Sequence, residues 1–235
     1  PLITRTITMT GDNAAMRVIE TDPADYATED DEGGYSAVRQ GAFAKMEIVP
    51  APGYYLEHVA ASGNDGDYAG FDALDKGSYE ADAETGETWI GEIHGVTDNI
   101  AVTVVAKPIH VLNITQGNSR VELEINNISP YGNTETVTFS DQSGTYRIRD
   151  GSGLEFSFVP ADGYGLADVT NVSSIIAETG FEHGTYVPGA STGESWYYDI
   201  ESLSGPLALV VESEPIYQLE TDIGDANVIM DLQGS

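Results

Sequence analysis

The feature that most constrains the fold of this chain is a repeat within its own sequence. Residues 85–89 (Thr-Gly-Glu-Thr-Trp) return 107 positions later as residues 192–196 (Thr-Gly-Glu-Ser-Trp). A second block recurs at an offset of 110 positions: residues 49–54 with residues 159–164, and Arg39 with Arg149. A repeat of this length indicates units of one fold placed in series, each the size of a small domain.

Three prolines set the phase of the repeat. Pro1, Pro108 and Pro215 are spaced by 107 residues, and each is followed by Leu or Ile. The sequence therefore predicts two complete repeats and the opening strands of a third, with these bounds: 1–107, 108–214 and 215–235.

Within each repeat the hydrophobic residues follow a period of two. Leu154, Phe156 and Phe158 alternate with polar residues, as do Met46 and Ile48. This alternation is typical of half-buried strands, and 26 Gly and 10 Pro residues separate such segments. About seven or eight short strands in each repeat predict an all-β fold of two tandem immunoglobulin-like β-sandwich domains, followed by a C-terminal strand or hairpin that begins a third repeat.

Aromatic residues at matching positions are the predicted structural core. Trp89 and Trp196 each open a strand near the end of a repeat, where a large ring can fill the space between two sheets. Tyr54 and Tyr164, which follow the shared Gly, are assigned to the core with them.

The composition excludes several classes of function. With 39 Asp and Glu against 9 Lys and Arg, the net charge of −30 argues against nucleic acid, whose phosphates need basic partners. No apolar run reaches the roughly 20 residues that span a membrane, so no membrane insertion is expected. The absence of Cys excludes disulfides and thiol catalysis. Such acidity suits a saline or divalent-rich extracellular setting, although an ordinary acidic surface protein fits too.

The repeat also tests for catalysis, because a group that acts once in each unit should recur. None of the four His residues is matched by a His in the other repeat. The carboxylates that recur flank the shared Trp: Glu87 with Glu194, and Glu92 with Asp199. Paired carboxylates can serve a glycosidase, but their spacing in alternating strands favours solvated faces. We therefore expect no enzyme and no cofactor beyond a metal ion.

A polar loop is the one candidate metal site. Hard oxygen ligands of the kind that Ca²⁺ prefers are gathered here: Asn64, Asp65, Asp67, Asp72 and Asp75. Its counterpart near residues 174–182 has lost most of these acids, and an ordinary polar loop is the alternative. Three Asn-X-Ser/Thr triplets, at Asn113, Asn127 and Asn171, would permit N-linked sugar in a host with that machinery.

The second half of each repeat resembles a known class of surface module. A strand ends in Val-Pro, passes through Gly-Tyr, and is followed by a closing strand such as Asn-Ile-Ala-Val-Thr-Val-Val at residues 99–105. This pattern is similar to the tandem modules of bacterial and archaeal surface proteins called divergent internalin-type B repeats or immunoglobulin-like bacterial repeats. The resemblance implies a stalk, spacer or adhesive element, and it implies no catalytic residues.

The segment after Pro215 is the predicted assembly element. Ile216, Val228, Met230 and Leu232 would form two strands that are marginal alone and expose unpaired edges. Such a segment either completes a sheet in a neighbouring molecule, which gives head-to-tail filaments, or is the start of a longer array.

Together these features predict a non-enzymatic extracellular or cell-surface protein, structural or adhesive, that acts as a stalk or forms filaments. Its expected partner is itself, through head-to-tail neighbours or further repeats. A carbohydrate-binding accessory module is the alternative, because 13 Tyr and 2 Trp residues offer rings on which a polysaccharide can stack.

Overall fold

The computed structural model describes residues 3–23, 28–29, 35–63, 70–173, 181–185 and 187–217. Within these ranges the chain forms seventeen strands and no helix, and the strands build stacked sheets, so the predicted all-β sandwich fold is confirmed. The same residues contain no helix of the length and apolarity needed to cross a membrane.

The N-terminal half pairs its strands in two layers. One layer has the order β4-β1-β9-β6, in which β1 and β9 run parallel. The other layer is antiparallel, in the order β2-β5-β8-β7. Strand β4 joins the two layers at one edge, because it pairs with both β1 and β2, and β3 pairs with β4. The strands are β1 (Thr4–Thr10), β2 (Ala14–Asp22), β3 (Thr28–Glu29), β4 (Tyr35–Arg39), β5 (Phe43–Pro50), β6 (Tyr54–Gly63), β7 (Ala73–Asp75), β8 (Trp89–Ile93) and β9 (Ile100–Gln116).

The C-terminal half has the same plan. One layer has the order β12-β9-β17-β14, with β9 and β17 parallel, and the other has the antiparallel order β11-β10-β13-β16-β15. The strands are β10 (Ser119–Ile128), β11 (Asn133–Phe139), β12 (Ser143–Arg149), β13 (Gly153–Pro160), β14 (Tyr164–Asn171), β15 (Glu182–His183), β16 (Trp196–Ile200) and β17 (Leu207–Pro215). Only β9 belongs to both halves.

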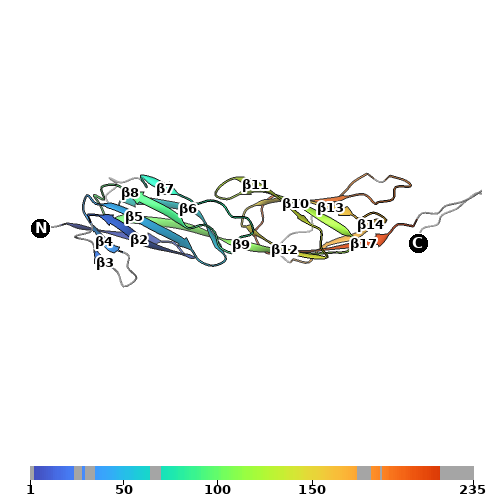
Figure 1. The fold of residues 1–235 in the computed structure, drawn as a ribbon, viewed down its shortest axis with the longest axis horizontal. Coiled ribbons are helices and arrows are strands. Elements are labelled where there is room, and N and C mark those ends of the chain that lie inside the picture. The colour runs from blue at the N-terminus through green and yellow to red at the C-terminus, as the bar shows by residue number, and fades with distance from the viewer. Residues whose placement is uncertain are drawn as a thin grey trace, which may run out of the picture.

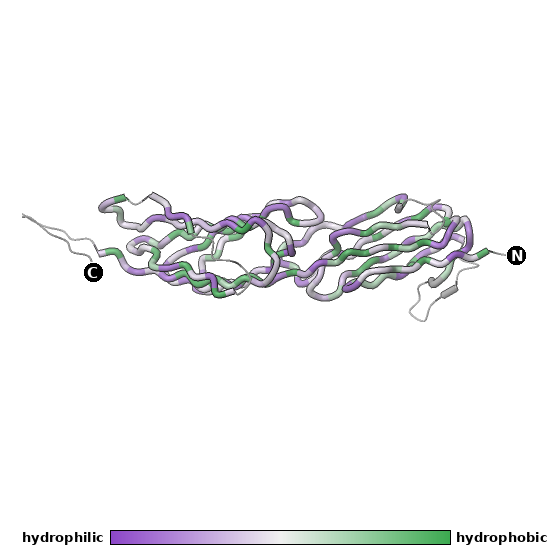
Figure 2. The backbone as a smooth tube through the Cα atoms, turned by 180° about the vertical axis from the view of Figure 1, so that it is seen from behind, coloured by the Kyte–Doolittle hydropathy of each residue, from purple (hydrophilic) through white to green (hydrophobic). Residues whose placement is uncertain are grey.

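Each half has its own cluster of buried side chains. One cluster is drawn from Ile7 to Val104 and the other from Leu112 to Val211. In β5 and β13 every second residue is buried, as the period of two predicts. Figure 2 shows the resulting alternation of hydrophobic and hydrophilic residues along the strands of both halves.

The ladders of the two halves correspond, although the offset between matching residues changes along the chain. Ile7 pairs with Ile100 as Leu112 pairs with Leu207, so the first strands match at an offset of 105 residues and the closing strands at 107. Val18 pairs with Met46 as Leu123 pairs with Phe156, so the offset rises from 105 to 110 and the C-terminal half has five further residues between these strands. The pairing of β10 with β11 shifts between Ile125 and Ile128, a β-bulge that takes up one residue and leaves the flanking ladders in register.

The two halves lie end to end along the long axis of the molecule, with the N- and C-terminal ends at opposite extremes (Figure 1). Strand β9 runs along this axis from one half into the other.

Candidate functional site: the junction between the two halves

Strand β9 changes partners where the halves meet. Up to Pro108 it pairs with β6, and from Ile109 onward it pairs with β12. Two backbone hydrogen bonds hold β9 to both halves at this point. Ile109 N–H donates to the Gly53 carbonyl over 2.8 Å, and Asp150 N–H donates to the Pro108 carbonyl over 3.1 Å. Proline has no N–H to donate, and Pro108 stands where one ladder ends and the next begins. The 17-residue strand, about 56 Å long at 3.3 Å per residue, thus crosses the boundary unbroken.

Arg149, the last residue of β12, reaches across the boundary into the N-terminal half. Its Nη2 lies 2.7 Å from Oε1 and 2.6 Å from Oε2 of Glu87, and its Nη1 donates to the Ser129 carbonyl over 2.9 Å. Arg149 is only 4% exposed, and the Glu87 side chain is 10% exposed. A carboxylate held by both oxygens in a buried site is among the stronger ion pairs that a protein can form.

Three tyrosine rings enclose the Arg149 guanidinium. Its Cζ lies 4.9 Å from the ring centre of Tyr55, 4.8 Å from that of Tyr79 and 5.5 Å from that of Tyr131. Two rings come from the N-terminal half and one from the C-terminal half, so the cation is held by both. These distances lie within the range of cation–π attraction, which strengthens when the cation is removed from water. We call the set Tyr55, Tyr79, Glu87, Tyr131 and Arg149 the junction.

The hydroxyl groups of these tyrosines add bonds between the halves. Tyr55 Oη donates to the Asp150 carbonyl over 2.8 Å, and Tyr131 Oη donates to the Lys76 carbonyl over 2.6 Å. Tyr79 Oη donates over 2.8 Å to Glu135, whose other oxygen accepts from Tyr146. Each half thus supplies donors to acceptors of the other.

The junction disfavours charged tyrosines. Burial, followed by the negative charge of Glu57, raises the pKa of Tyr55 to about 12. Burial and the charge of Glu87 raise the pKa of Tyr131 to about 12, and burial with the bond to Glu135 raises the pKa of Tyr79 above its ordinary value. The three phenols therefore stay protonated, as hydrogen-bond donors, across the physiological pH range.

The glycine of the repeated Thr-Gly-Glu motif explains how the segment that carries Glu87 packs against β6. Gly86 N–H donates to the Tyr54 carbonyl over 2.8 Å, which places Gly86 directly on the start of β6. A Cβ at Gly86 would lie 2.5 Å from the Tyr55 Cβ, a distance that real Cβ atoms do not reach. Only glycine permits this approach, so the motif fixes the position of the carboxylate that follows it.

Exposed charges surround the junction. The Arg147 N–H donates to Asp82 over 2.8 Å, and its guanidinium lies 3.6 Å from the same carboxylate. Lys107 Nζ lies 2.8 Å from Glu57 and 3.9 Å from Asp150, and its hydrogen bond to Glu57 raises the pKa of Lys107. These pairs cross or flank the boundary, but they are exposed enough for solvent to weaken them.

The geometry of the junction suits a mechanical role. Every charge in it is neutralised, and its donors already have acceptors in the protein. The recurring carboxylates weighed as an acid–base pair have separate partners, because Glu87 binds Arg149 while Glu92 lies 3.3 Å from Lys45. What this arrangement can do is fix the angle and twist between two sandwiches.

The predicted core residues have different environments. Trp89 is 1% exposed and lies within the N-terminal cluster, and Trp196 is half-buried against the C-terminal cluster, where its ring lies 4.1 Å from that of His183. Tyr54 and Tyr164 are only half-buried and belong to neither cluster, contrary to their assignment. The neighbouring Tyr55 is fully buried, but it also lies outside the N-terminal cluster: its ring faces the Arg149 guanidinium, and the Gly86 backbone packs on it, whereas Leu56 belongs to the cluster.

The predicted calcium loop lies partly outside the described residues, which omit Asn64, Asp65 and Asp67. Asp72 and Asp75 are described, and both carboxylates bind backbone N–H groups, those of His94 and Gly77. In the part of the chain that the structure covers, no three His, Asp or Glu side chains are grouped to hold a metal ion. Calcium binding stays a prediction.

Of the predicted assembly residues, only Ile216 is described. Its N–H donates to the Gly163 carbonyl over 2.7 Å. Val228, Met230 and Leu232 lie outside the described residues.

The three predicted sugar acceptors differ in accessibility. Asn113 is exposed on β9 and accepts a hydrogen bond from Thr145, and Asn127 is exposed at the end of β10. The Asn171 side chain accepts from the Ser173 N–H, and its Nδ2 is buried.

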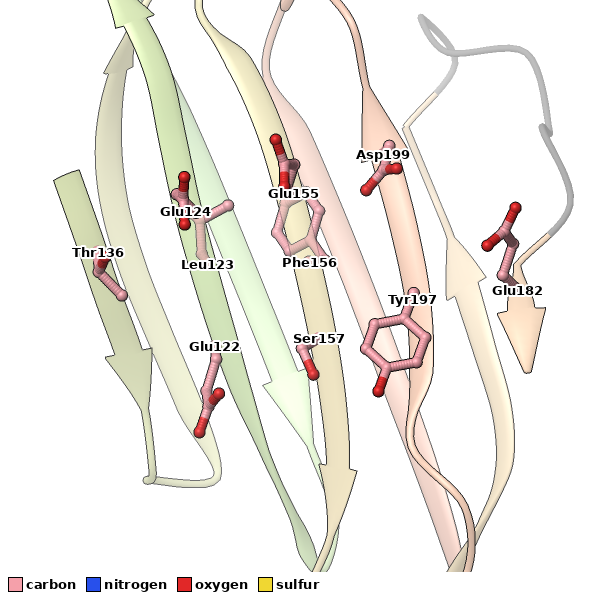
Figure 3. Close-up of a pocket in the computed structure, with 10 residues that line it drawn as sticks. All are labelled: Glu122, Leu123, Glu124, Thr136, Glu155, Phe156, Ser157, Glu182, Tyr197 and Asp199. Carbon is pink, nitrogen blue, oxygen red and sulfur yellow. The ribbon is translucent and has the colours of Figure 1, made fainter. Parts of the chain in front are cut away.

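A shallow groove of about 410 Å³ lies on the outer face of the β11-β10-β13-β16-β15 sheet (Figure 3). Glu124, Glu155 and Asp199 stand directly opposite one another on three neighbouring strands, and Tyr197 is 44% exposed beside them. The groove also contains Glu122 and Glu182. Like charges directly opposite one another on neighbouring strands destabilise a sheet, so the stability of the sheet does not account for this row of carboxylates.

Comparisons with known proteins place no name on the fold. No family model matches the chain, and no curated protein matches it. One solved structure, titled "Trapped Toxin", aligns over 77% of this chain and 48% of its own length, at 9% identity and a TM-score of 0.19. This chain therefore spans about half of that protein.

Proposed function

We propose that this protein is a non-enzymatic structural protein of the cell surface, a stiff segment of a stalk or filament built from tandem β-sandwiches. The observation that carries the proposal is the junction, in which β9 crosses unbroken between halves while Arg149 is held by Glu87 of the other half. A linker between independent domains would be short of such contacts and rich in Gly or Pro.

The corresponding bonds in the two halves support a tandem array. Gly53 and Gly163 each accept the N–H of the residue that leaves the sandwich, over 2.8 and 2.7 Å. Both glycines have positive φ, 81° and 83°, in the region where glycine is favoured. The chain thus enters the second sandwich and leaves it along equivalent paths. Units joined in this way add length in a fixed direction, which is what a spacer needs.

The charge supports an extracellular setting. At a net charge of −30 the sandwiches repel one another in dilute buffer, while salt or divalent cations relieve that repulsion.

Single-molecule energy transfer tests the proposed stiffness. The chain has no Cys, so Thr97→Cys and Ala161→Cys give two unique labelling sites. Thr97 is exposed in the loop that leads into β9, and Ala161 is exposed in the turn beside the other end of that strand. A stiff rod gives one narrow distribution of transfer efficiency.

The comparison variant for that experiment is Arg149→Met, which should broaden the distribution or add a second population, with Arg120→Met as the surface control. A native distribution as broad as that of Arg149→Met would contradict the proposal.

The groove of Figure 3 favours carbohydrate binding as a second candidate. Trp89 is buried, and the half-buried Trp196 ring lies 4.1 Å from that of His183 and is tilted by 40° to it. Tyr197 is exposed, with Ser157 and Asp199 beside it as hydrogen-bonding groups. Calorimetric titration with soluble polysaccharides tests this candidate: binding that Tyr197→Ala abolishes would support it, and heats equal to those of dilution would eliminate it.

A further inference from the structure

The outer end of the C-terminal half repeats the backbone geometry of the junction. Ile216 N–H bonds to Gly163 as Ile109 N–H bonds to Gly53. Gly193 N–H donates to the Tyr164 carbonyl over 2.9 Å, as Gly86 N–H donates to the Tyr54 carbonyl. Glu194 follows this glycine as Glu87 follows Gly86, yet in the described part of the chain its carboxylate has no hydrogen bond or ion pair of its own.

The outer end of the N-terminal half repeats the backbone geometry that surrounds Arg149 at the junction. Arg39 pairs with Thr4 as Arg149 pairs with Ile109. Gln40 N–H donates to the Ile3 carbonyl over 2.9 Å, as Asp150 N–H does to that of Pro108. The molecule therefore has the position of the junction glutamate at one end and the position of the junction arginine at the other.

At a second pair of positions, the charges found at the two outer ends are the reverse of those found at the junction. At the junction, Lys107 lies near Asp150, which in turn binds His110 over 2.9 Å. In the outer ends Glu214 stands in the place of Lys107, Gln40 in that of Asp150 and Arg5 in that of His110. The positive partner has moved from one side of the contact to the other, and the two sides remain complementary.

Arg5 itself points to a missing partner. Its Nε is buried without a hydrogen-bond partner, and its Nη2 reaches only Gln40, over 3.5 Å. Among described residues the N-terminal end thus presents an arginine that is poorly satisfied within its own chain. The exposed Glu214 of the opposite end is the group that the junction geometry brings to it.

We propose that the two ends of this chain bind each other in trans, so that copies join head to tail with the geometry of the internal junction. Glu194 of one copy binds Arg39 of the next, and Glu214 binds Arg5. This proposal rests on the proposed structural function and adds the partner, a second copy of the chain. Because contacts of this kind are heterologous and leave a free site at each end, they propagate as a linear filament.

The outer contact should be weaker than the internal one, for two reasons. Gly165 stands in the place of Tyr55, so one ring of the enclosure is missing. Ile216 of one copy and Thr4 of the next also correspond to a single position of β9, Ile109. Either Ile216 must give up its bond to Gly163, or Thr4 must leave its pairing with Arg39. Association is therefore expected to be reversible and concentration-dependent.

Charge exchange tests the proposal on the intact chain. Sedimentation velocity at fixed salt, up to about 1 mM protein, populates even weak end-to-end contacts. The native chain should form dimers and longer oligomers. Glu194→Arg and Arg39→Glu should each abolish them, whereas the double variant, and a mixture of the two single variants, should associate again. The mixture should form alternating chains, because each variant's C-terminal end is complementary to the N-terminal end of the other variant and repels that of its own kind. Glu124→Arg, on an exposed strand position away from both ends, is the matched control and should associate like the native chain.

Each other outcome overturns the proposal. A native chain that stays monomeric throughout, or association that Glu194→Arg and Arg39→Glu leave intact, excludes this contact. If only a chain shortened to residues 1–215 associates, the following residues of the same chain cover the end, and the intact chain does not bind a second copy. Circular dichroism identifies a misfolded variant, and Glu194→Gln then replaces it. Energy transfer measured on dilute monomers tests the stiff rod separately, so failure of one proposal is distinguishable from failure of the other.

Discussion

Replacing Arg149 with Met should be the most damaging single change at the junction. The substitution keeps most of the side-chain volume but removes the guanidinium, with its bonds to Glu87 and Ser129 and its contacts to three rings. Removing one partner of a buried ion pair costs about 3–5 kcal/mol, because the other charge stays buried without compensation. Glu87 keeps one bond, from the Glu80 N–H at 2.9 Å, so we expect about 3 kcal/mol, at the lower end.

Urea unfolding followed by tryptophan fluorescence measures this loss in both halves. Trp89 reports on the N-terminal cluster and Trp196 on the C-terminal cluster. With a slope of about 1–3 kcal/mol per M, a loss of 3 kcal/mol lowers the midpoint by at least about 1 M. We also expect the two tryptophans to report separate transitions in the variant, because the contact that couples the halves is lost.

Two further variants decide whether the ion pair is the cause. Arg149→Met combined with Glu87→Met removes both charges, and well-packed apolar replacements of a buried pair are often neutral, so most of the stability should return. Arg120→Met is the surface control: its pair with Glu122 at 2.9 Å has side chains 55% and 43% exposed, and we expect a loss below about 0.5 kcal/mol. A loss at Arg149 as small as that at Arg120, or a double variant no more stable than Arg149→Met alone, would refute the reasoning.

Two other predictions concern the packing and the pH response of the junction. Gly86→Ala forces a Cβ against Tyr55 and should cost about 1–3 kcal/mol in urea unfolding, whereas Gly153→Ala, whose nearest neighbour would be at 3.4 Å, should cost less than half as much; equal losses would contradict the clash. Unfolded tyrosines ionise near pH 10, but Tyr55 and Tyr131 hold their protons to about 12, so the unfolded chain binds fewer protons in this window. The stabilisation is complete below pH 10 and is lost as the pH rises through 12; a urea midpoint that is flat from pH 9 to 12 in a series of buffers, while absorbance at about 295 nm shows ionisation, would exclude this linkage.

The strand pattern was open to prediction because it depends on local chemistry. Leu154, Phe156 and Phe158 alternate with polar neighbours, and burial of one face of a strand requires that alternation. Trp89 was likewise predictable, since a large ring that opens a strand in both repeats has little place but the core. Tyr54 was misassigned because recurrence identified the position but not its burial: the buried ring is that of the next residue, Tyr55, which the contact with Arg149 and Gly86 encloses.

The junction was harder to predict because it belongs to neither repeat. Its five residues come from four separate segments of the chain, two of them in each half. A comparison of the repeats detects only residues that both units share. It could not find Tyr55, because the matching residue of the second repeat is Gly165. One signal was present: Arg39 and Arg149 recur in a chain with only 9 basic residues, and a scarce cation at a repeated position indicates a repeated partner.

The burial of the Arg149–Glu87 pair also explains how the junction can persist at high salt, the condition that screens the repulsion within such an acidic chain. At physiological salt the Debye length is about 8 Å, and it shortens further in brine, so exposed pairs such as Arg17 with Glu47 lose much of their attraction as the repulsion among the acids is screened. Arg149 and Glu87 are almost fully enclosed, and buried pairs are screened far less. Salt therefore weakens the repulsion between neighbouring molecules while it leaves intact the contact between the two halves, as the proposed stalk requires. An exposed lysine pair at the same boundary could not separate these two effects, and this gives a physical reason for an arginine, held by both carboxylate oxygens and three rings, at the point where the sandwiches meet.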